Sequence, residues 1–353
     1  MRYIWIGASV RAERLMNKWG KLNKNFYPTV VLDNDSGKVG SLLNGVPIDS
    51  VTNIQKYLDG HHKIVITTSY VNEIKAQLQK MNIFENTVDW FEFDNNVSKI
   101  YLERNARLLN EKKTKRCFII GTGPSLAELD LNLLMNEDKI MVNSFYKNEE
   151  LVKLNPKFWV LADENFWLNQ TMFLDPILNT LATKLTSTQL LIWDEALPYL
   201  TIPPTIENRF SYYHLDKVAK YEISPIDFTD TLPHFAYNVI SVALMLAIYL
   251  KYEEIICIGC DHTWWGYSKE EVAEGIALPH YYEKNEKEIK FFESSFRKMG
   301  YDRLQETVEL QKMEYNALRN MAEQYGLQVY NATPGGYLES FERRKYEDFF
   351  ITD

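Results

Sequence analysis

The sequence has little cysteine, and this shortage excludes a protein built on disulfides. Its three cysteines, Cys117, Cys257 and Cys260, all lie in or beside apolar stretches, so they do not form a disulfide framework. Cys257 and Cys260 are spaced i, i+3, which on a strand points the two thiols to opposite faces. No second Cys/His pair is placed to complete a zinc site. We interpret all three cysteines as buried core thiols.

Basic residues are also in short supply, because 39 lysines and arginines stand against 48 aspartates and glutamates and leave a formal net charge of −9. Binding a polyanion requires a basic face that releases counterions, so the composition argues against a nucleic-acid partner. Any anionic ligand of this protein must therefore be met by local groups.

Long apolar runs are absent as well. The longest one, residues 236–250, falls short of the roughly 20 residues that a membrane helix needs. Residues 1–7 lead directly into a strand pattern without the basic start and cleavage site of a signal peptide, so we expect a cytoplasmic protein. The basic and aromatic stretch at 341–350 leaves open a peripheral contact with the inner face of a membrane, but packing of this tail on its own domain is the preferred interpretation.

What the sequence does contain is a repeated alternation of short apolar strands and helices over 353 residues, which is too long for one typical domain. Residues 1–95 predict one small parallel sheet, 96–115 a connecting helix and linker, and 116–353 a second domain. We therefore predict an α/β protein with two Rossmann-like domains and mostly parallel sheets. The expected strands lie at 3–7, 29–32, 64–67, 117–120, 158–161 and 255–258, and the expected helices run through residue 19 and over 71–81 and 238–250.

A glycine turn follows the strand at 117–120, in the order Gly121, Thr122, Gly123, Pro124, Ser125. A strand, a glycine turn and a helix start build a phosphate cradle, although the same pattern also occurs as a plain tight turn. Polar residues follow further predicted strands, and in parallel sheets ligands bind at this carboxyl edge. These residues are Asn143, Asp163 and Asp261. The sequence therefore predicts a nucleotide site.

The helix that begins near Asn238 offers a second N-terminus to an anion, with Asn238 as its expected cap and His234 just before it. This end could support a phosphate or an acceptor sugar. The alternative, that Asn238 only caps a core helix, stays open.

The second domain resembles two related groups of bacterial and archaeal proteins, the lipooligosaccharide sialyltransferases and the motility-accessory-factor or pterin-diphosphokinase-like proteins. The resemblance rests on the sequence from Ile119 to Leu126, on the Asn-Ser-Phe-Tyr run at 143–146, on residues 238–261 and on the Asn-Ala-Thr-Pro-Gly-Gly run at 331–336. It implies a GT-A-like nucleotide-sugar transferase domain. The nucleotide contacts that it implies are Gly121, Thr122, Gly123, Pro124, Ser125, Asn143 and Asp163. Asp163 replaces an asparagine of the sialyltransferases. Asn238 and Asp261 join this set because they lie at a helix start and at a strand end.

Residues 1–95 resemble the nucleotide-binding half domain found beside sugar-nucleotide dehydratases and some acyltransferases, most closely at 31–47. The resemblance implies an acid after the second strand that meets a ribose hydroxyl. The first loop, at 7–12, lacks the second and third glycines of the dinucleotide fingerprint, so we favour a structural or regulatory domain. Residues 33–35 match a metal-holding D-x-D pattern, but a strand-ending turn explains them better and we assign no metal there.

Sugar transfer from CMP needs a base for the acceptor hydroxyl and donors for the departing phosphate. The resemblance implies a late histidine as the base, but Glu309 stands near that place. His280 lies in the long polar segment 261–300, which we interpret as a lid, and it is the first candidate, followed by Glu309 and His262. Tyr267, Tyr281 and Tyr282 are candidate donors, and Trp264 and Trp265 either stack on a ligand or pack the loop.

The sequence thus predicts a glycosyltransferase that moves a sialic-acid-like sugar from a CMP-activated donor to a glycan or glycolipid acceptor in surface-polysaccharide biosynthesis, with no required cofactor. Two alternatives stay open. One is a diphosphokinase of the pterin type that uses ATP and magnesium, with Asp163 and Asp261 near the metal. The other is a non-catalytic nucleotide-binding assembly protein. The sequence also leaves the oligomeric state open, including a homo-oligomer.

Overall fold

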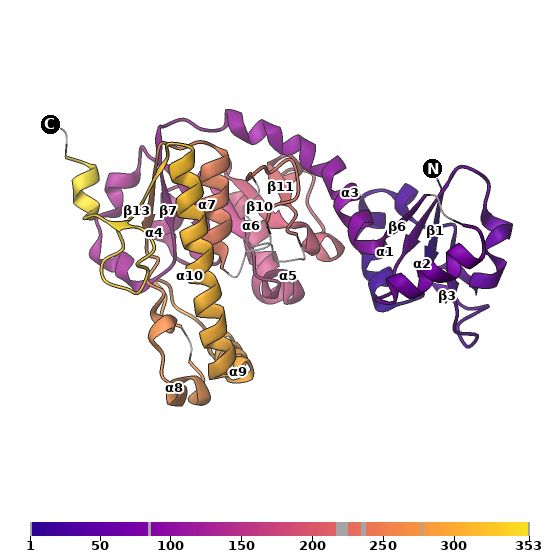
Figure 1. Ribbon diagram of the computed structural model, residues 1–353. Coiled ribbons are helices and arrows are strands. Elements are labelled where there is room, and N and C mark those ends of the chain that lie inside the picture. Colours follow the sequence, from indigo (N-terminus) through magenta and orange to yellow (C-terminus); the bar gives the residue numbers. More distant parts are fainter. Residues whose placement is uncertain (1, 84–85, 217–224, 234–237, 277, 352–353) are drawn as a thin grey trace. The chain divides into compact units, whose positions relative to one another are not determined.

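The computed structural model describes residues 2–83, 86–216, 225–233, 238–276 and 278–351, which fall into two compact units (Figure 1). Unit 1 contains the chain up to Tyr101 and also the segment Asp194–Leu200, and unit 2 contains the remainder. The division therefore falls between Tyr101 and Leu102, inside the stretch that the sequence predicted as a linker. The sequence did not indicate that Asp194–Leu200 belongs with the first unit.

Unit 1 is built on a sheet with the strand order β3-β4-β2-β1-β5-β6, in which only the β3–β4 pair is antiparallel. The predicted small parallel sheet is confirmed. Its strands are β1 (Arg2–Ile6), β2 (Val30–Asp33), β3 (Leu42–Leu43), β4 (Val46–Ser50), β5 (His62–Ile66) and β6 (Thr87–Asp89). Its helices are α1 (Val10–Leu22), α2 (Val71–Lys80) and α3 (Trp90–Leu102), with 3-10 helices at Lys24–Phe26 and Val51–Tyr57.

Helix α1 forms where a cap and an apolar stripe coincide. The Ser9 hydroxyl accepts the N–H of Ala12, which satisfies one of the donors left open at a helix start. Ala12, Leu15, Met16 and Trp19 recur at the i, i+3, i+4, i+7 spacing and are all buried. This stripe fixes which face of α1 packs into unit 1.

Next to this stripe, α1 carries a buried charge. Lys18 is only 1% exposed, and its ammonium lies 3.1 Å from Asp94, 3.0 Å from Asp194 and 3.2 Å from Glu195. Arg14 also pairs with Glu195. A buried cation is tolerated only when it is paired, and two of the three carboxylates here come from Asp194–Leu200. These ion pairs are the physical reason why that segment belongs to unit 1.

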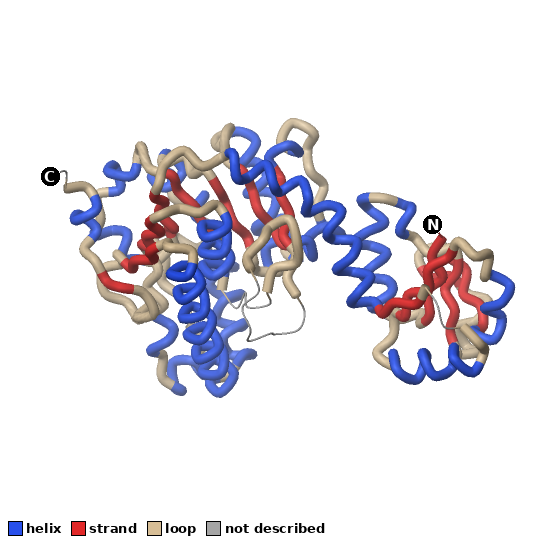
Figure 2. The backbone as a smooth tube through the Cα atoms, turned by 45° about the horizontal axis from the view of Figure 1, so that its top comes forward, coloured by secondary structure: helices blue, strands red, loops and turns tan. Residues whose placement is uncertain are grey.

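Unit 2 is built on a larger sheet with the order β11-β10-β9-β8-β7-β12-β13-β14, and every neighbouring pair is parallel. Figure 2 shows its strands among helices. The strands are β7 (Arg116–Ile120), β8 (Asp138–Val142), β9 (Phe158–Leu161), β10 (Gln189–Trp193), β11 (Phe210–Tyr213), β12 (Glu254–Ile258), β13 (Gln328–Asn331) and β14 (Glu342–Arg343).

Its α-helices are α4 (Glu149–Lys153), α5 (Asn165–Leu168), α6 (Asp175–Thr183), α7 (Val239–Tyr249), α8 (Lys269–Glu274), α9 (Glu286–Met299) and α10 (Tyr301–Gln324). Short 3-10 helices include Glu103–Asn110, Pro124–Glu128, Phe145–Lys147 and Thr263–Gly266. Together the two sheets confirm the predicted α/β class with two Rossmann-like, mostly parallel domains.

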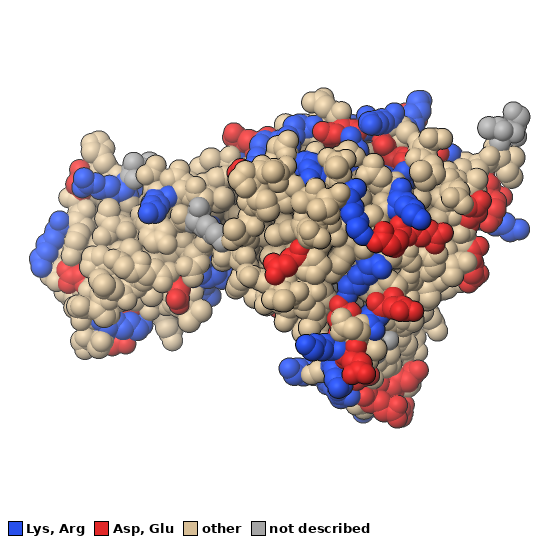
Figure 3. Space-filling view, turned by 180° about the vertical axis from the view of Figure 1, so that it is seen from behind, with Lys and Arg blue, Asp and Glu red and all other residues tan. Residues whose placement is uncertain are grey.

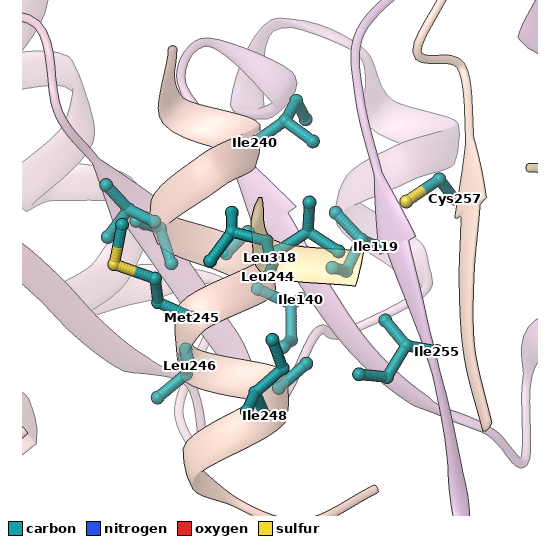
Figure 4. Packing of buried hydrophobic residues seen from close by; sticks show 14 of the residues in the cluster. Ile119, Ile140, Ile240, Leu244, Met245, Leu246, Ile248, Ile255, Cys257 and Leu318 are labelled. Carbon is teal, nitrogen blue, oxygen red and sulfur yellow. The ribbon is translucent and has the colours of Figure 1, made fainter. Parts of the chain in front are cut away.

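The core of unit 2 centres on α7, which is apolar around its whole circumference. Leu244 and Ile248 of α7 pack with Ile119 of β7 and Ile140 of β8, and Leu318 of α10 belongs to the same cluster (Figure 4). A helix that is apolar all round is stable only when it is buried on all sides, so this segment is the core helix that the sequence predicted. In the described ranges, no helix combines the length and the hydropathy needed to cross a membrane.

The strand order places a ligand crevice in unit 2. The chain adds β8, β9, β10 and β11 on one side of β7 and then returns to add β12, β13 and β14 on the other side. The order therefore reverses between β7 and β12, and ligands of open parallel sheets bind outside the carboxyl ends of the strands at such a point. On the face seen in Figure 3, acidic and basic side chains are interspersed rather than separated.

Candidate functional site

A cleft lies at the carboxyl ends of β7, β8, β9 and β12, and it has two adjoining compartments. The smaller compartment has a cavity volume of about 160 Å³ and the larger one about 410 Å³. Asn143, Asn238, Val239, Trp264 and Leu278 line both of them. The smaller compartment is also lined by several residues that the sequence singled out, namely Gly121, Thr122, Gly123, Pro124, Asp261, His262 and His280.

The glycine turn packs tightly against the loop after β12. A Cβ atom added at Gly121 would lie 2.2 Å from the carbonyl oxygen of Gly259, and one added at Gly123 would lie 1.7 Å from Oδ2 of Asp261. Real Cβ atoms do not approach other atoms so closely, so both positions require glycine. The reason for these glycines is the neighbouring loop of the protein itself.

The expected phosphate cradle therefore needs a correction. The N–H of Gly121 donates to Ile258, that of Gly123 to Gly259, and that of Ser125 to the Asp261 carboxylate. The segment that follows is the five-residue 3-10 helix Pro124–Glu128 rather than an α-helix. Because these N–H groups already have acceptors inside the protein, they do not form a free anion cradle.

Asp261 binds the glycine turn through Ser125. Its Oδ1 accepts the N–H of Ser125 at 3.1 Å and its Oδ2 accepts the hydroxyl of Ser125 at 2.8 Å, and the residue is 8% exposed. Burial raises the pKa of this carboxyl group against the lowering effect of the two hydrogen bonds. In this arrangement Asp261 and Ser125 hold two loops together at the floor of the smaller compartment.

His280 is brought to the cleft, as the sequence predicted. Its Nδ1 lies 3.2 Å from the hydroxyl oxygen and 3.3 Å from the carbonyl oxygen of Thr122, and the N–H of Tyr281 donates to the same carbonyl at 2.8 Å. A carbonyl oxygen only accepts, so this contact favours the tautomer with the proton on Nδ1 and a lone pair on Nε2, whereas the Thr122 hydroxyl can donate to or accept from Nδ1. Burial, with Lys284 and Lys147 nearby, lowers the pKa of His280 to about 3. The ring is therefore neutral at physiological pH.

Tyr282 supports His280 from behind. The two rings stack with centroids 4.8 Å apart and an interplanar angle of 6°. The ammonium groups of Lys147 and Lys284 lie 5.5 and 5.8 Å from the centre of the Tyr282 ring, and Lys147 forms an ion pair with Glu288. Burial lowers the pKa of Lys284 to about 8. These two cations thus lie next to the wall of the cleft rather than among its described lining residues.

Tyr281 turns away from the cleft. Its hydroxyl donates to Glu150 at 2.5 Å, and this hydrogen bond raises the pKa of Tyr281 to about 12. Tyr281 does not line either compartment in the part of the chain that is described, whereas its backbone helps to hold the glycine turn. The structure therefore does not bring its phenol to a leaving phosphate.

Asn143 stands where the two compartments meet. It has a left-handed backbone with φ of 50°, and its side-chain oxygen is buried and has no hydrogen-bond partner among the described residues. A buried amide oxygen that lacks a partner costs free energy, which a ligand donor would recover. Asn143 is therefore the residue of the predicted set whose geometry is most open to a ligand.

Asn238 and His262 form one hydrogen-bonded unit in the wall of the cleft. The Asn238 Oδ1 accepts the N–H of Ile240 and so caps α7, while its Nδ2 lies 3.4 Å from Nε2 of His262. The hydroxyl of Tyr315 lies 2.8 Å from the same Nε2, and Nδ1 lies 2.9 Å from the carbonyl of Cys260. Both ring nitrogens of His262 are thus engaged, so it is a supporting residue rather than a base. His234 lies outside the described residues.

The larger compartment combines aromatic and acidic residues. Asp163 and Glu164 follow β9, Trp193 ends β10, and Trp264 is shared with the smaller compartment. The side chain of Asp163 keeps accessible surface, yet the surrounding protein removes water from its carboxyl group, and this desolvation raises its pKa. Sequence reasoning predicted no strand at β10 and missed Trp193, and the signal that could have found both was the apolar run at 190–193. It also missed the helical residues Phe296, Met299, Leu304, Thr307 and Gln311.

Two other candidates lie apart from the described lining of the cleft. Glu309 is an exposed residue of α10 that pairs with Lys312 at 2.8 Å. Trp265 is buried and donates its indole N–H to Gln311 at 3.1 Å, so it packs the loop. The segment 261–300, expected as a lid, contributes Trp264, Leu278 and His280 to the cleft.

Asp33, the acid at the end of β2 in unit 1, also forms its contacts within the protein. Asp33 accepts the N–H of Ala8 at 2.7 Å and pairs with Lys38 at 3.4 Å. Its carboxylate therefore closes the loop where the resemblance implied a ribose contact. Within the described ranges, no group of three or more His, Cys, Asp and Glu side chains is arranged to hold a metal ion.

Comparison with protein-family models, with curated proteins and with solved structures found no match to this chain. The fold itself defines an α/β protein with two Rossmann-like units, and the cleft of unit 2 lies where such sheets bind ligands.

Proposed function

We propose that unit 2 is a glycosyltransferase that moves a sialic-acid-like sugar from a CMP-activated donor to a glycan acceptor. The observation that carries this proposal is the placement of His280. Thr122 of the glycine turn holds Nδ1 of this cleft-lining residue, and in the tautomer with the proton on Nδ1 the neutral ring has Nε2 as its proton acceptor. A positioned neutral imidazole is the group that takes a proton from a sugar hydroxyl.

The reaction needs one proton transfer and one bond exchange. As the acceptor oxygen bonds to the anomeric carbon of the donor, its proton passes to Nε2 of His280, and the bond between that carbon and the phosphate oxygen breaks with its electron pair going to CMP. The negative charge of the bound donor would raise the low pKa of His280, because a nearby anion favours the protonated ring. The base would thus become stronger when the donor is present.

The phosphate of the donor would be stabilised by dipoles and by cations at longer range. The described residues that line the two compartments include no lysine or arginine. The N-terminus of α7, at Asn238 and Val239, carries the positive end of the helix dipole at the cleft, and Lys147 and Lys284 lie close behind His280 and Tyr282. This arrangement favours one anionic group at the smaller compartment.

The test combines binding with turnover. Thermal unfolding is measured with CMP, with CMP-sialic acid, and with ATP in the presence and absence of magnesium. A ligand at about 100 times its dissociation constant adds roughly 2.7 kcal/mol to the stability of the native state. We expect a shift with CMP and CMP-sialic acid. A shift only with ATP and magnesium would contradict the proposal and favour the diphosphokinase.

Two variants then test the assignment of the base. His280→Ala should reduce release of CMP from CMP-sialic acid by a factor of about 10² to 10⁴, the usual contribution of a general base. Glu309→Gln should leave the rate unchanged, because Glu309 is exposed and pairs with Lys312. Binding of CMP without any release of CMP from the donor by the wild type would favour the non-catalytic assembly protein.

A further inference from the structure

The larger compartment has a chemical character of its own. Its charged lining residues, among those described, are Asp163 and Glu164, and both are acids. The hydrogen bonds of Asp163 to Asn165 are made by Oδ1, which leaves Oδ2 for a ligand. Glu164 is exposed, and its carboxylate has no hydrogen bond or ion pair with the described part of the chain. Two carboxylates with spare acceptor capacity therefore stand at one cavity.

The walls beside these acids are aromatic and partly exposed. Trp193 and Trp264 pack against the main hydrophobic cluster, and each keeps part of its surface open. Trp167 packs edge-on against Trp193 with centroids 6.4 Å apart, and Trp265 packs edge-on against Trp264 at 6.2 Å. The Nε1 of Trp193 is buried and finds no hydrogen-bond partner in the part of the chain that the structure describes. The indole rings are thus held firmly by their neighbours.

We propose that the larger compartment is the acceptor subsite, and that it binds an uncharged sugar ring on its tryptophans with the ring hydroxyls donating to Asp163 and Glu164. This inference rests on the function proposed above. Ionised carboxylates only accept hydrogen bonds, so they match neighbouring hydroxyl groups, and they repel a sugar that carries its own carboxylate. The apolar face of a pyranose matches an indole, and a cavity of about 410 Å³ is in the range of small-ligand sites.

The position of the subsite agrees with transfer between the compartments. Asn143, Trp264 and Leu278 line both compartments, so a sugar in the larger one adjoins the space that His280 lines. Because the proposed donor sugar is an acid, the acidic compartment selects against it and in favour of a neutral acceptor. Charge therefore assigns the two substrates to different compartments.

The first experiment measures acceptor binding without any donor. Saturation-transfer NMR is recorded with methyl galactoside, methyl glucoside and the methyl glycoside of sialic acid, using wild type, Asp163→Asn, Glu164→Gln and the control Glu306→Gln. Glu306 is an exposed acid on α10 that pairs with Arg303 and does not line the cleft in the described chain. We expect a neutral glycoside to bind wild type and the control, and to bind either cleft variant about tenfold more weakly. Equal binding of the sialic acid glycoside, or no weakening in the variants, would overturn the inference.

The second experiment separates this subsite from the donor site. Hydrolysis of CMP-sialic acid by water is measured without acceptor, and transfer is measured with the neutral glycoside. The two cleft variants should keep the hydrolysis rate and raise the acceptor KM about tenfold. A change in hydrolysis with an unchanged acceptor KM would place the donor sugar in this compartment instead. If wild type binds the neutral glycoside but never releases CMP, the transferase proposal fails while the sugar subsite stands. Unfolding midpoints equal to that of wild type confirm that the variants are folded.

Discussion

Ser125 donates both its backbone N–H and its hydroxyl to one carboxylate, that of Asp261, at 3.1 and 2.8 Å. This pair joins the turn after β7 to the loop after β12, the two strands between which the strand order reverses. The floor of the candidate site is therefore a contact of the protein with itself. Its rigidity is set by two residues 136 positions apart in the sequence.

Asp261→Ala should lower the free energy of unfolding by about 2–3 kcal/mol, because two buried donors of Ser125 lose their acceptor. Ser125→Ala should cost less, about 1 kcal/mol, since the backbone N–H keeps the carboxylate as its partner. Urea denaturation of the two variants measures the difference. An equal cost for both changes would show that Asp261 does not hold the loop in this way.

Gly123→Ala should destabilise the protein by about 1–3 kcal/mol or more, since its Cβ would meet Oδ2 of Asp261 at 1.7 Å and the carbonyl of Gly259 at 2.8 Å. Gly37→Ala is the matched control, because its added Cβ meets only a flexible carboxylate of Asp35 at 3.2 Å. Thermal unfolding compares the two. A Gly123 variant as stable as the Gly37 variant would contradict the close packing of the turn.

Lys18→Met should be among the most damaging single changes in unit 1. It leaves Asp94, Asp194 and Glu195 buried without their shared cation, and breaking a buried ion pair costs about 3–5 kcal/mol. Lys24→Met, an exposed position of the same unit, serves as the control and should change stability by less than about 0.5 kcal/mol. Chemical denaturation followed by tryptophan fluorescence measures both, and similar midpoints would argue against a structural role for Lys18.

His262 gives a pH dependence whose sign follows from its burial. Burial lowers the pKa of His262 from 6.5 to about 4, so the unfolded chain binds a proton there that the folded chain does not. The stability that the neutral His262 contributes to the folded state is fully present above about pH 6.5 and is lost as the pH falls toward 4. His262→Asn suits the left-handed backbone, with φ of 50°, and removes the titrating ring.

The stability difference between wild type and His262→Asn should therefore shrink as the pH falls from 7 to 5, by on the order of 2 kcal/mol. Urea denaturation at the two pH values gives this difference directly. A difference that stays constant with pH would mean that His262 does not titrate between its folded and unfolded values in this range.

Local patterns predicted part of the strands and the core helix, but gave no bounds for β10, β11, β13 and β14 of unit 2. The predicted strand 158–161 has the same bounds as β9, and the expected helix at 238–250 forms as α7, because both are short apolar runs bounded by polar or turn residues. The left-handed Asn143 and the histidine in the polar segment also stand at the cleft, since strand ends and long loops are where side chains are free to meet a ligand.

The contacts that link distant residues could not be predicted in this way. The sequence predicted that Gly121 and Gly123 form a phosphate loop. Both must be glycine because Gly259 and Asp261, more than a hundred positions away, leave no space for a Cβ atom. Glu309 stands near the place of the histidine that the resemblance implies, yet it lies on the exposed side of α10, because helix periodicity decides which way a side chain points. No pattern in the sequence pairs Lys18 with Asp194, because the pairing depends on three-dimensional packing.

The buried ion pairs of Lys18 also have a consequence for synthesis on the ribosome. Unit 1 includes Asp194–Leu200, so its final core cannot close until residue 200 has been translated and has left the exit tunnel. By then the residues that form β7, β8, β9 and β10 of unit 2 have already been translated. Domains usually fold in the order in which they are made. Here the unit that is begun first waits for a segment in the middle of its neighbour, so all the strands of its sheet are translated well before Asp194 and Glu195, the later partners of the buried Lys18.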